Sequence, residues 1–542
     1  MSEAMGVVMP SRIVRYIALP VVLAATCLVT ACGSSSSPVF VPPTNTLPPP
    51  SDTLSLVSGP SPFGLLCSGA QQTGTLYRNA EVEPSLAVNP TDPANMIATW
   101  QQDRWSNGGA QGLMAAASFD SGQSWTRTPL PTDICAGGTA ATSADYLRAS
   151  DPWVSFAPDG TAYAISLSFD GQVFQSGSRS AILVTRSTDG GLTWGDPVTL
   201  IVDGSTAFND KESITADPND SSYVYAVWDR LTQSNEGPTW FSRTTDAGAS
   251  WEAARIIYDP GVGNQTIGNQ IAVLPDGTLV NAFIRIDGTN TSSPVSTIRI
   301  IRSLDNGANW STPVTVASSL AVGTRDPDTR QAVRDGAGLF DIAVGPGNEL
   351  VIVWQDARFT DGTHDAIALS RSLDGGNTWS APVAVNSDTT VAAFTPMVHM
   401  RADGTMAVTW FDWRNNDADK TLMQTDYYRA ESTDALNFTE KLLSGPFDLG
   451  LAPVANGLFL GDYQGLADDA QDFVPLWVQT NNSGTDNRTD VYLLPPGSGF
   501  AGVRKPSRVY AAKPAPAGEI SAATRERVSA NLLRLLASRR TP

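Results

Sequence analysis

Hydrophobic and polar residues alternate along this chain in short segments, the pattern of half-buried β-strands. A typical unit is an apolar strand, a turn rich in Pro, Asp and Gly, and a second apolar strand that ends near a Trp, as in 83–90 followed by 96–100. Its first strand returns at 151–158, 212–218, 269–275, 340–346, 395–401 and 462–468. The seven units predict an all-β fold with almost no helix outside the termini.

A second pattern, Ser/Thr-x-Asp-x-Gly-x-Ser/Thr-Trp, starts at Ser118, Ser187, Thr244, Ser303, Ser372 and Ser432, 57 to 69 residues apart. The fourth copy carries Asn309 at the second Ser/Thr position, and the sixth ends in Phe438. The Asp can accept hydrogen bonds from amides ahead of it, the Gly can take a positive φ, and the Trp can pack between sheets. A period of this length in a β-rich chain predicts one propeller blade per repeat.

This motif resembles the Asp-box of the sialidase superfamily, over roughly residues 77–496. The resemblance implies a β-propeller, but enzymes, receptors and assembly factors all carry the motif, so it implies no single function. The seven strand units favour seven blades over the six usual in sialidases, which remain the alternative. The last unit has strands at 473–480 and 490–494 but little room for a fourth strand. We therefore expect a strand from 53–79 to complete it.

The N-terminal residues have the order of an export signal. Arg12 and Arg15 precede an apolar run at 16–29, and the sequence Val-Thr-Ala-Cys-Gly that ends in Gly33 resembles a bacterial lipobox. The resemblance implies that residues 1–31 are removed and that Cys32 is lipidated. The alternative, an ordinary signal peptide or a short anchor, fits less well because the apolar run is too short to span a bilayer. The protein is thus expected in the cell envelope, anchored by lipid and exposed to the periplasm or the cell exterior.

Four segments follow from this organisation. The signal peptide at 1–31 is followed by a Ser/Pro-rich tether at 32–63, which should be extended. The propeller spans 64–500, and a tail occupies 501–542. The tail contains a basic amphipathic pattern in helical spacing, which would either lie on anionic lipid or a partner surface, or dock on the propeller or fray.

Composition narrows the partners. The formal net charge of −19 and the pI near 4.5 argue against nucleic acid, because phosphate binding depends on clustered Lys and Arg. His364 and His399 are the only histidines, so zinc of the usual kind lacks ligands. We expect no cofactor, although calcium held by carboxylates and carbonyls stays open. Export leaves Cys67 and Cys135, which predict one disulfide, with two separate buried thiols as the alternative. We expect a monomer.

Polar residues collect where the second strands end. Five of these strands deliver Asp and Arg to one rim, and the candidate substrate-binding residues are Arg104, Arg230, Arg285, Arg358 and Arg414. The starts of the first strands add acidic residues at Glu83, Asp151, Glu212 and Asp462. Together they predict a concave polar site that suits a carbohydrate. The alternative is that the Asp and Arg residues form ion pairs between blades.

The resemblance to sialidases also implies catalytic roles. Tyr463, within 461–466, matches the nucleophilic Tyr, Glu212 its activating partner, and Asp103 the acid/base. One position departs from the family, because Glu83 stands where the Arg of an Arg-Ile-Pro motif binds the substrate carboxylate. Sialoside hydrolysis should therefore be weak. The sequence predicts an anchored glycoside hydrolase of exo-α-sialidase type or a related type, acting on extracellular glycans or glycoproteins. The alternative is a non-catalytic propeller that binds glycan or protein, or assists envelope assembly.

Overall fold

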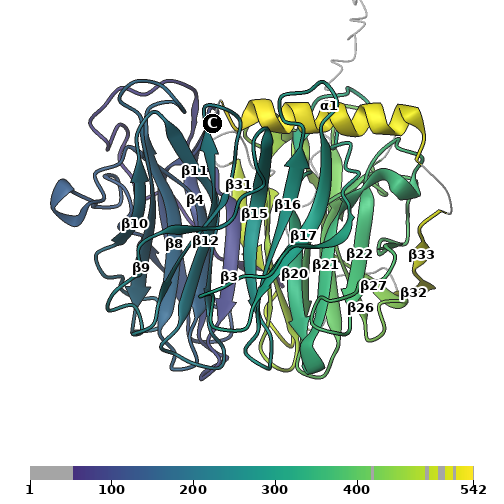
Figure 1. The fold of residues 1–542 in the computed structure, drawn as a ribbon, viewed down its shortest axis with the longest axis horizontal. Helices are drawn as coiled ribbons and strands as arrows, with labels where there is room; N and C mark the ends of the chain where they lie inside the picture. The colour runs from purple at the N-terminus through teal and green to yellow at the C-terminus, as the bar shows by residue number, and fades with distance from the viewer. Residues whose placement is uncertain (1–52, 417–419, 482–487, 499–506, 517–519, 541–542) are drawn as a thin grey trace, which may run out of the picture. The chain divides into compact units, whose positions relative to one another are not determined.

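The computed structural model describes residues 53–416, 420–481, 488–498, 507–516 and 520–540 (Figure 1). This part of the chain is built of β-strands, with one α-helix, α1 (Ala522–Ser538), and four short 3₁₀ turns. The all-β prediction is confirmed. The expected signal peptide, Cys32 and most of the tether lie outside the described residues. No helix in the described ranges has the length and apolar character needed to cross a membrane.

The strands form antiparallel sheets in chain order. Two sheets have four consecutive strands: β11 (Ala207–Ala216), β12 (Val224–Thr232), β13 (Thr239–Thr244) and β14 (Arg255–Tyr258), then β15 (Asn264–Val273), β16 (Leu279–Asp287), β17 (Val295–Ser303) and β18 (Val314–Ser318). Two more gain a fifth strand from the tail: β20 (Phe340–Gly345), β21 (Glu349–Asp356), β22 (Ala366–Ser372) and β23 (Val383–Ala384) with β33 (Lys513–Pro514), and β24 (Ala393–Met400), β25 (Met406–Asp412), β26 (Gln424–Ser432) and β27 (Asn437–Asp448) with β32 (Arg508–Ala511).

The remaining strands form one large sheet, one four-stranded sheet and a short parallel pair. The nine-stranded sheet contains β2 (Leu76–Tyr77), β3 (Val82–Val88), β4 (Met96–Trp105), β5 (Ala110–Ser118), β6 (Thr126–Pro129), β7 (Arg148–Phe156), β8 (Ala162–Asp170), β9 (Arg179–Ser187) and β10 (Val198–Asp203). The parallel pair is β19 (Val333–Arg334) and β28 (Leu458–Phe459). The four-stranded sheet joins β29 (Gly465–Asp468), β30 (Phe473–Thr480) and β31 (Thr489–Leu493) to β1 (Ser55–Leu56).

The strand expected from the N-terminal segment is therefore present. β1 pairs antiparallel with β31, as its outer neighbour. The innermost strands contact one another in a closed cycle from β3 through β7, β11, β15, β20, β24 and β29 and back to β3. This arrangement is that of a β-propeller. Cys67 and Cys135 form a disulfide, which ties the N-terminal segment to the loop after β6.

The repeated motif forms turns that satisfy their own backbone. In the first copy, the Oγ of Ser118 accepts a hydrogen bond from the amide of Gly122 at 2.8 Å, and Asp120 accepts one from the amide of Ser124 at 2.8 Å. In the sixth copy, Asp434 accepts bonds from the amide and the side chain of Asn437, so the turn survives the loss of its consensus. The six turns start where β5, β9, β13, β17, β22 and β26 end.

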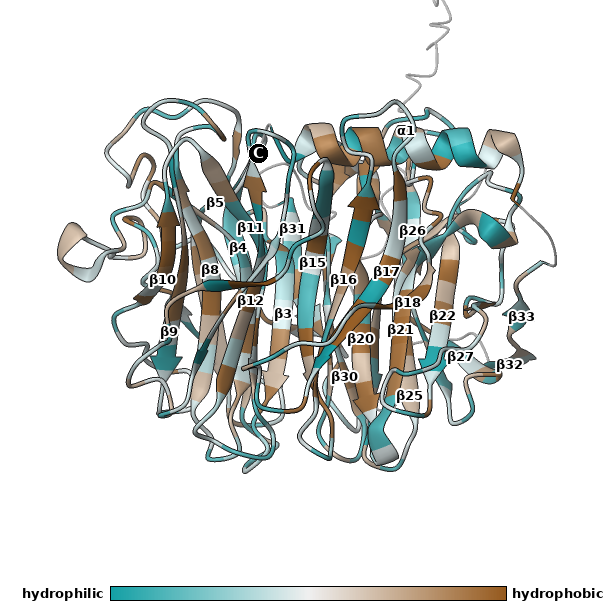
Figure 2. Cartoon of the chain, viewed as in Figure 1, coloured by the Kyte–Doolittle hydropathy of each residue, from teal (hydrophilic) through white to brown (hydrophobic). Residues whose placement is uncertain are grey.

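The core consists of apolar residues along the strands (Figure 2). The Trp residues expected near the ends of the second strands are fully buried at Trp100, Trp228, Trp354, Trp410 and Trp477. They fill the space between neighbouring sheets, where removing a large side chain would leave a costly cavity.

The C-terminal helix docks on the propeller. Val528, Leu532 and Leu536 are buried against the apolar side chains of the sheets that start at β15 and β20. Arg539, just past the helix, pairs with Asp210 at the start of β11 and with Asp229 near the end of β12. The helix therefore lies at the end of the strands where the innermost strands begin (Figure 1). Since successive strands are antiparallel, the motif turns lie at the opposite end.

Candidate active site

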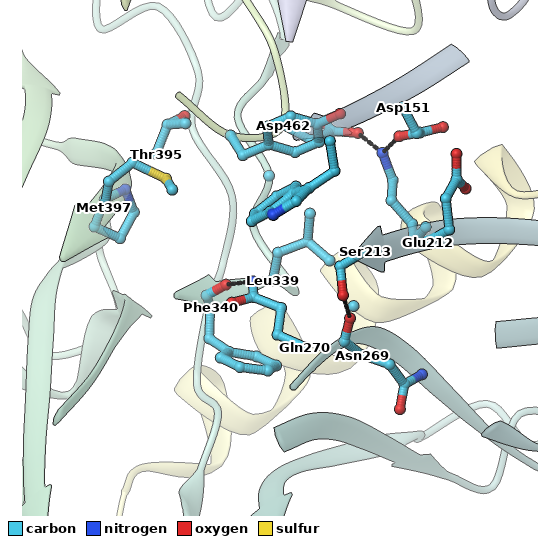
Figure 3. A pocket seen from close by; sticks show the side chains of 16 residues that line it. Asp151, Glu212, Ser213, Asn269, Gln270, Leu339, Phe340, Thr395, Met397 and Asp462 are labelled. Atoms are coloured by element: carbon cyan, nitrogen blue, oxygen red, sulfur yellow. Dashed lines mark hydrogen bonds and ion pairs between the residues drawn. The ribbon is translucent and has the colours of Figure 1, made fainter. Parts of the chain in front are cut away.

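One ammonium group joins three carboxylates where the innermost strands begin. The Nζ of Lys211 lies 2.6 Å from Asp151 Oδ1, 2.7 Å from Asp462 Oδ2 and 3.1 Å from Glu83 Oε1. The four residues come from β3, β7, β11 and the turn before β29. In Figure 3, Asp151 and Asp462 point toward the same nitrogen. Because all four side chains are almost fully buried, these ion pairs are poorly screened by water.

Local backbone geometry aims these side chains into the centre. The pairing of innermost and second strands is interrupted by a register shift in β3, β7, β11, β15 and β24. Glu83, Asp151, Lys211 and Thr395 lie in these shifts with φ between 50° and 53°, a region that non-glycine residues seldom occupy. A β-bulge turns the extra residue out of the pleat, and strained residues concentrate at functional sites. The bulges therefore place four polar side chains at one level.

A second cation holds Asp462. The guanidinium of Arg334 contacts both of its carboxylate oxygens, at 3.0 Å and 2.6 Å, and stacks 4.3 Å from the ring of Phe459. Burial would raise the pKa of Asp462, but the charges of Arg334 and Lys211 outweigh burial and hold it well below its ordinary value. Asp462 is thus ionised.

Glu83 differs from the other two partners of Lys211. Burial and the charge of Asp151 raise the pKa of Glu83 to about 8, against the opposing effect of Lys211. Glu83 therefore carries a proton for much of the time at neutral pH, and the cluster avoids a third full negative charge.

Glu212 stands beside this cluster without joining it. Its side chain is buried, and neither carboxyl oxygen has a hydrogen-bond partner within the described part of the chain. Burial and the charge of Asp151 raise its pKa well above the ordinary 4.5. In Figure 3 its carboxyl group lies near that of Asp151. The structure thus places a buried acid with a raised pKa beside a carboxylate that Lys211 holds in an ion pair.

Tyr463 lies at the same level. Its ring packs against Trp153 with centroids 5.2 Å apart, and its hydroxyl donates to the carbonyl of Pro152 at 3.4 Å. Burial and the surrounding carboxylates, first Glu83 and then Asp151, raise its pKa well above 10. The phenol is therefore neutral, and its surroundings oppose the phenolate that a nucleophile would need.

These residues line a narrow waist between two larger cavities. The waist has a volume of about 40 Å³ and is lined by Asp151, Lys211, Glu212, Asp462 and Tyr463 among others. Toward α1 it meets a cavity of about 420 Å³, which shares Asp151, Lys211 and Asp462 with it. On the other side lies a cavity of about 1060 Å³. The 420 Å³ cavity has the size of a small-ligand pocket, and the charged cluster is its floor.

The structure brings together two of the three predicted catalytic residues. Tyr463 and Glu212 both line the waist, whereas Asp103 lines neither the waist nor the adjoining cavities. Asp103 is fully buried and accepts hydrogen bonds from the hydroxyl of Ser61 at 2.6 Å and the amide of Asn79 at 2.8 Å. It fastens the N-terminal segment to β4, a placement that does not suit an acid/base catalyst.

Four of the five predicted substrate-binding arginines form ion pairs away from the waist. Arg230 pairs with Asp203 of the neighbouring sheet at 2.6 Å, and the other three pair with an Asp two residues away along the chain: Arg285 with Asp287, Arg358 with Asp356 and Arg414 with Asp412. None of the four lines the waist or the 420 Å³ cavity. Only the pair of Arg230 with Asp203 joins two blades, as the ion-pair alternative expected, and the other three pairs close within one blade. Arg104 does line the 420 Å³ cavity.

Sequence reasoning missed Lys211 and Arg334. Lys211 occupies a first-strand start at which acidic residues were sought, and Arg334 lies in a two-residue strand between sheets. The sequence did contain a signal for the bulges themselves. A polar residue precedes Pro at three of them, in Glu83-Pro84, Asp151-Pro152 and Thr395-Pro396. That pairing marks the start of an innermost strand, where the bulge lies.

Comparisons with known proteins give only distant likenesses. No family model matches it, and no curated protein does. Among solved structures, an α-L-arabinanase from Penicillium chrysogenum complexed with arabinobiose is 14% identical over 84% of this chain and 99% of that one, with a TM-score of 0.41. An α-L-arabinofuranosidase from Fusarium graminearum is 14% identical over 66% and 92%, and the Hadza microbial sialidase Hz136 is 16% identical over 61% and 63%, both with a TM-score of 0.42. Likenesses this distant assign no activity.

Removing the central cation of the charged cluster should destabilise the folded protein. Replacing Lys211 with Met leaves buried carboxylates without their shared partner, and we expect a loss of about 3–5 kcal/mol in the free energy of unfolding at neutral pH. The deficit should shrink as the pH falls, because the folded state of the variant then takes up protons on carboxylates whose pKa has risen.

Chemical denaturation across pH measures this effect. Lys420→Met is the matched control, since the side chain of Lys420 is 72% exposed and its pair with Asp328 should contribute little. Equal stability of the two variants, or a deficit for Lys211→Met that grows toward acid, would contradict the assigned role of Lys211.

Proposed function

We propose that the protein is a glycoside hydrolase of the cell envelope. In this proposal Glu212 is the general acid, and Asp151 is the nucleophile or general base. The observation that carries the proposal is the contrast between these neighbours. Glu212 is buried and unpaired within the described residues and its pKa is raised, while Asp151 is held in an ion pair by Lys211 at 2.6 Å. Glycoside hydrolysis needs such a pair, one carboxyl group to protonate the leaving oxygen and one carboxylate to attack or to activate water.

Each step follows from the state of these groups. Glu212 gives its proton to the glycosidic oxygen as the bond to the anomeric carbon breaks. Asp151 stabilises the positive charge that develops on the sugar, either as nucleophile or as base for a water molecule. Trp153 and Tyr463 offer aromatic surface at the same level, on which a sugar ring can rest.

This division of roles differs from that in the sialidases which the motif resembles. There the Tyr attacks and the Glu activates it, but here both groups have raised pKa values and favour their neutral forms. Among the described residues that line the waist, Lys211 is the only cation, and it is already engaged by three acidic side chains, so it is poorly placed to bind a sialic acid carboxylate there. We therefore propose a substrate other than a simple sialoside.

The envelope location rests on the sequence. A lipid on Cys32 and a Ser/Pro-rich tether would hold a monomeric propeller near the membrane, facing extracellular glycans or glycoproteins. We expect a Cys32→Ser protein to fractionate as soluble with its melting temperature unchanged, because the anchor lies far along the chain from the propeller. Recovery of this variant in the membrane pellet at high salt would contradict the lipid anchor.

We also propose seven blades. In support, the nine-stranded sheet contains two successive antiparallel meanders, β3–β6 and β7–β10, which are joined by a single pairing between Ala110 and Ala149. Counting each meander as a blade gives one blade for each innermost strand in the cycle. An experimental structure in which these strands form one blade would contradict this count.

The hydrolase proposal predicts that Glu212→Gln lowers turnover about 10²–10⁴-fold, because the amide cannot donate the proton. A panel of fluorogenic glycosides with neutral and acidic sugars supplies the substrate. Activity of the unsubstituted protein should persist through neutral pH and fall on the alkaline side, since the raised pKa of Glu212 keeps the acid protonated well above pH 4.5.

Two further variants make this test specific. Glu526→Gln changes an exposed glutamate on α1 and should keep full activity. Tyr463→Phe should retain most activity if Asp151 and Glu212 do the chemistry, whereas its complete loss with the fold intact would restore the Tyr to the role of nucleophile. Tight glycan binding without cleavage of any substrate would favour a non-catalytic binding propeller instead.

A further inference from the structure

The 420 Å³ cavity above the charged floor carries an excess of positive charge. Its lining includes six Lys or Arg side chains and four Asp side chains, in a chain whose formal net charge is −19. The walls come from the loop around 325–337 and from α1, whose Arg534 and Leu535 face the cavity. The lining of this cavity is therefore net positive, whereas the whole protein is strongly negative.

The four aspartates of the cavity are already engaged, three of them by cations that also line it. Asp151 and Asp462 pair with Lys211, and Asp462 also pairs with Arg334. Asp210 pairs with Arg539.

Asp335 serves the loop itself. Its carboxylate accepts hydrogen bonds from the amides of Thr324 and Ala337, at 2.6 Å and 3.0 Å, and from the side chain of Gln355 at 2.9 Å. In the described part of the chain, none of these four aspartates forms an ion pair with the remaining arginines, although the charge of Asp335 does act on Arg534.

Arg104 is the most buried of these arginines. Only 2% of it is exposed, its Nη1 donates to Gln101 at 2.6 Å, and its Nε has no hydrogen-bond partner within the described segments. Its guanidinium lies 5.0 Å from the centroid of the Phe459 ring. Burial and the neighbouring charge of Arg334 lower its pKa to about 10, so it is still a cation at neutral pH. A buried cation with an unused donor is costly unless a ligand satisfies it.

Arg325 and Arg534 complete the set from the loop and the helix. Arg325 donates to the carbonyl of Arg330 at 3.3 Å, and Arg534 donates to the carbonyl of Val322 at 3.1 Å and to Asn531 at 3.0 Å. Burial and the charge of Arg325 lower the pKa of Arg534, against the opposing charges of Asp335 and Asp365, so the two guanidinium groups are close enough to repel each other. Across the described ranges, no ion pair involves Arg104, Arg325 or Arg534.

We propose that Arg104, Arg325 and Arg534 form a subsite for an anionic group of the substrate glycan, a carboxylate or a sulfate ester. Guanidinium groups bind such oxyanions through paired N–H donors. The subsite lies above the charged floor, so the anion belongs to a sugar unit bound beside the reacting one. The C-terminal helix supplies Arg534 and thus completes the site. The assignment rests on the proposed function for the nature of the substrate, but the anion site can be tested by binding alone.

The test measures binding in protein that cannot turn over substrate. Isothermal titration calorimetry of the Glu212→Gln protein, at constant ionic strength, compares sodium glucuronate, sodium sulfate and the neutral methyl glucoside. We expect an anion to bind, and its affinity to fall about tenfold or more in Arg325→Gln and in Arg534→Gln, since each removes one charged donor. Arg527→Gln is the matched control, because Arg527 lies on α1 and bonds to Gly362 but does not line the cavity.

The outcomes separate the two anions and the two proposals. Binding of glucuronate alone identifies a carboxylate, and binding of sulfate alone identifies a sulfate ester. Failure of both anions to bind, or equal binding by the control and both arginine variants with unchanged melting temperatures, overturns the subsite. A protein that binds the anion through these arginines but cleaves no glycoside would contradict the hydrolase and leave the subsite standing.

Discussion

The contact between Lys211 and its carboxylates is the interaction on which the candidate site depends. Acidic side chains converge where the innermost strands begin, and without a cation their burial would be prohibitive. Lys211 lies within ion-pair distance of Glu83, Asp151 and Asp462 but leaves the oxygens of Glu212 unpaired. Two kinds of carboxyl group therefore lie in the same small space: Asp151 and Asp462 in ion pairs, and Glu212, together with Glu83 despite its contact with Lys211, with a raised pKa. This difference in protonation, more than the number of acids, is what makes the site suited to acid–base chemistry.

The propeller brings these side chains together, and it does so with strained backbone at the starts of the innermost strands. Each innermost strand of β3, β7, β11 and β24 carries a bulge with a non-glycine residue at positive φ, and the bulged side chains meet at one level of the central channel. The helix α1 then roofs the cavity above this level, with three of its apolar side chains buried against the sheets. The site thus combines residues from the first and last parts of the chain, and one wall of the 420 Å³ cavity comes from a helix outside the repeats.

Sequence patterns predicted the architecture well because each repeat carries its own turn chemistry. The motif that starts at Ser118 forms the expected internal hydrogen bonds, and the missing outer strand came from the N-terminal segment as β1. The site was predicted only in part. Tyr463 and Glu212 lie together, but Asp103 and four of the arginines serve the scaffold. The order of the strands predicts the end of the blade at which a residue lies. It does not predict whether an Asp and an Arg there bind each other or point into the central channel. The bulge that carries Lys211 also lacks the Pro that follows the bulged residue in β3, β7 and β24, so no sequence signal showed where Lys211 points.

The protonation state of Glu212 is the most direct test of this account. Infrared difference spectroscopy of a pH titration, with Glu212→Gln as the reference, isolates the carbonyl stretch of that one protonated carboxyl group. The account predicts that the band is present at neutral pH, disappears only at more alkaline pH, and is missing from the variant. If Glu212 instead loses its proton near its ordinary pKa of 4.5, it cannot act as the acid at neutral pH, and the proposed pairing with Asp151 is contradicted.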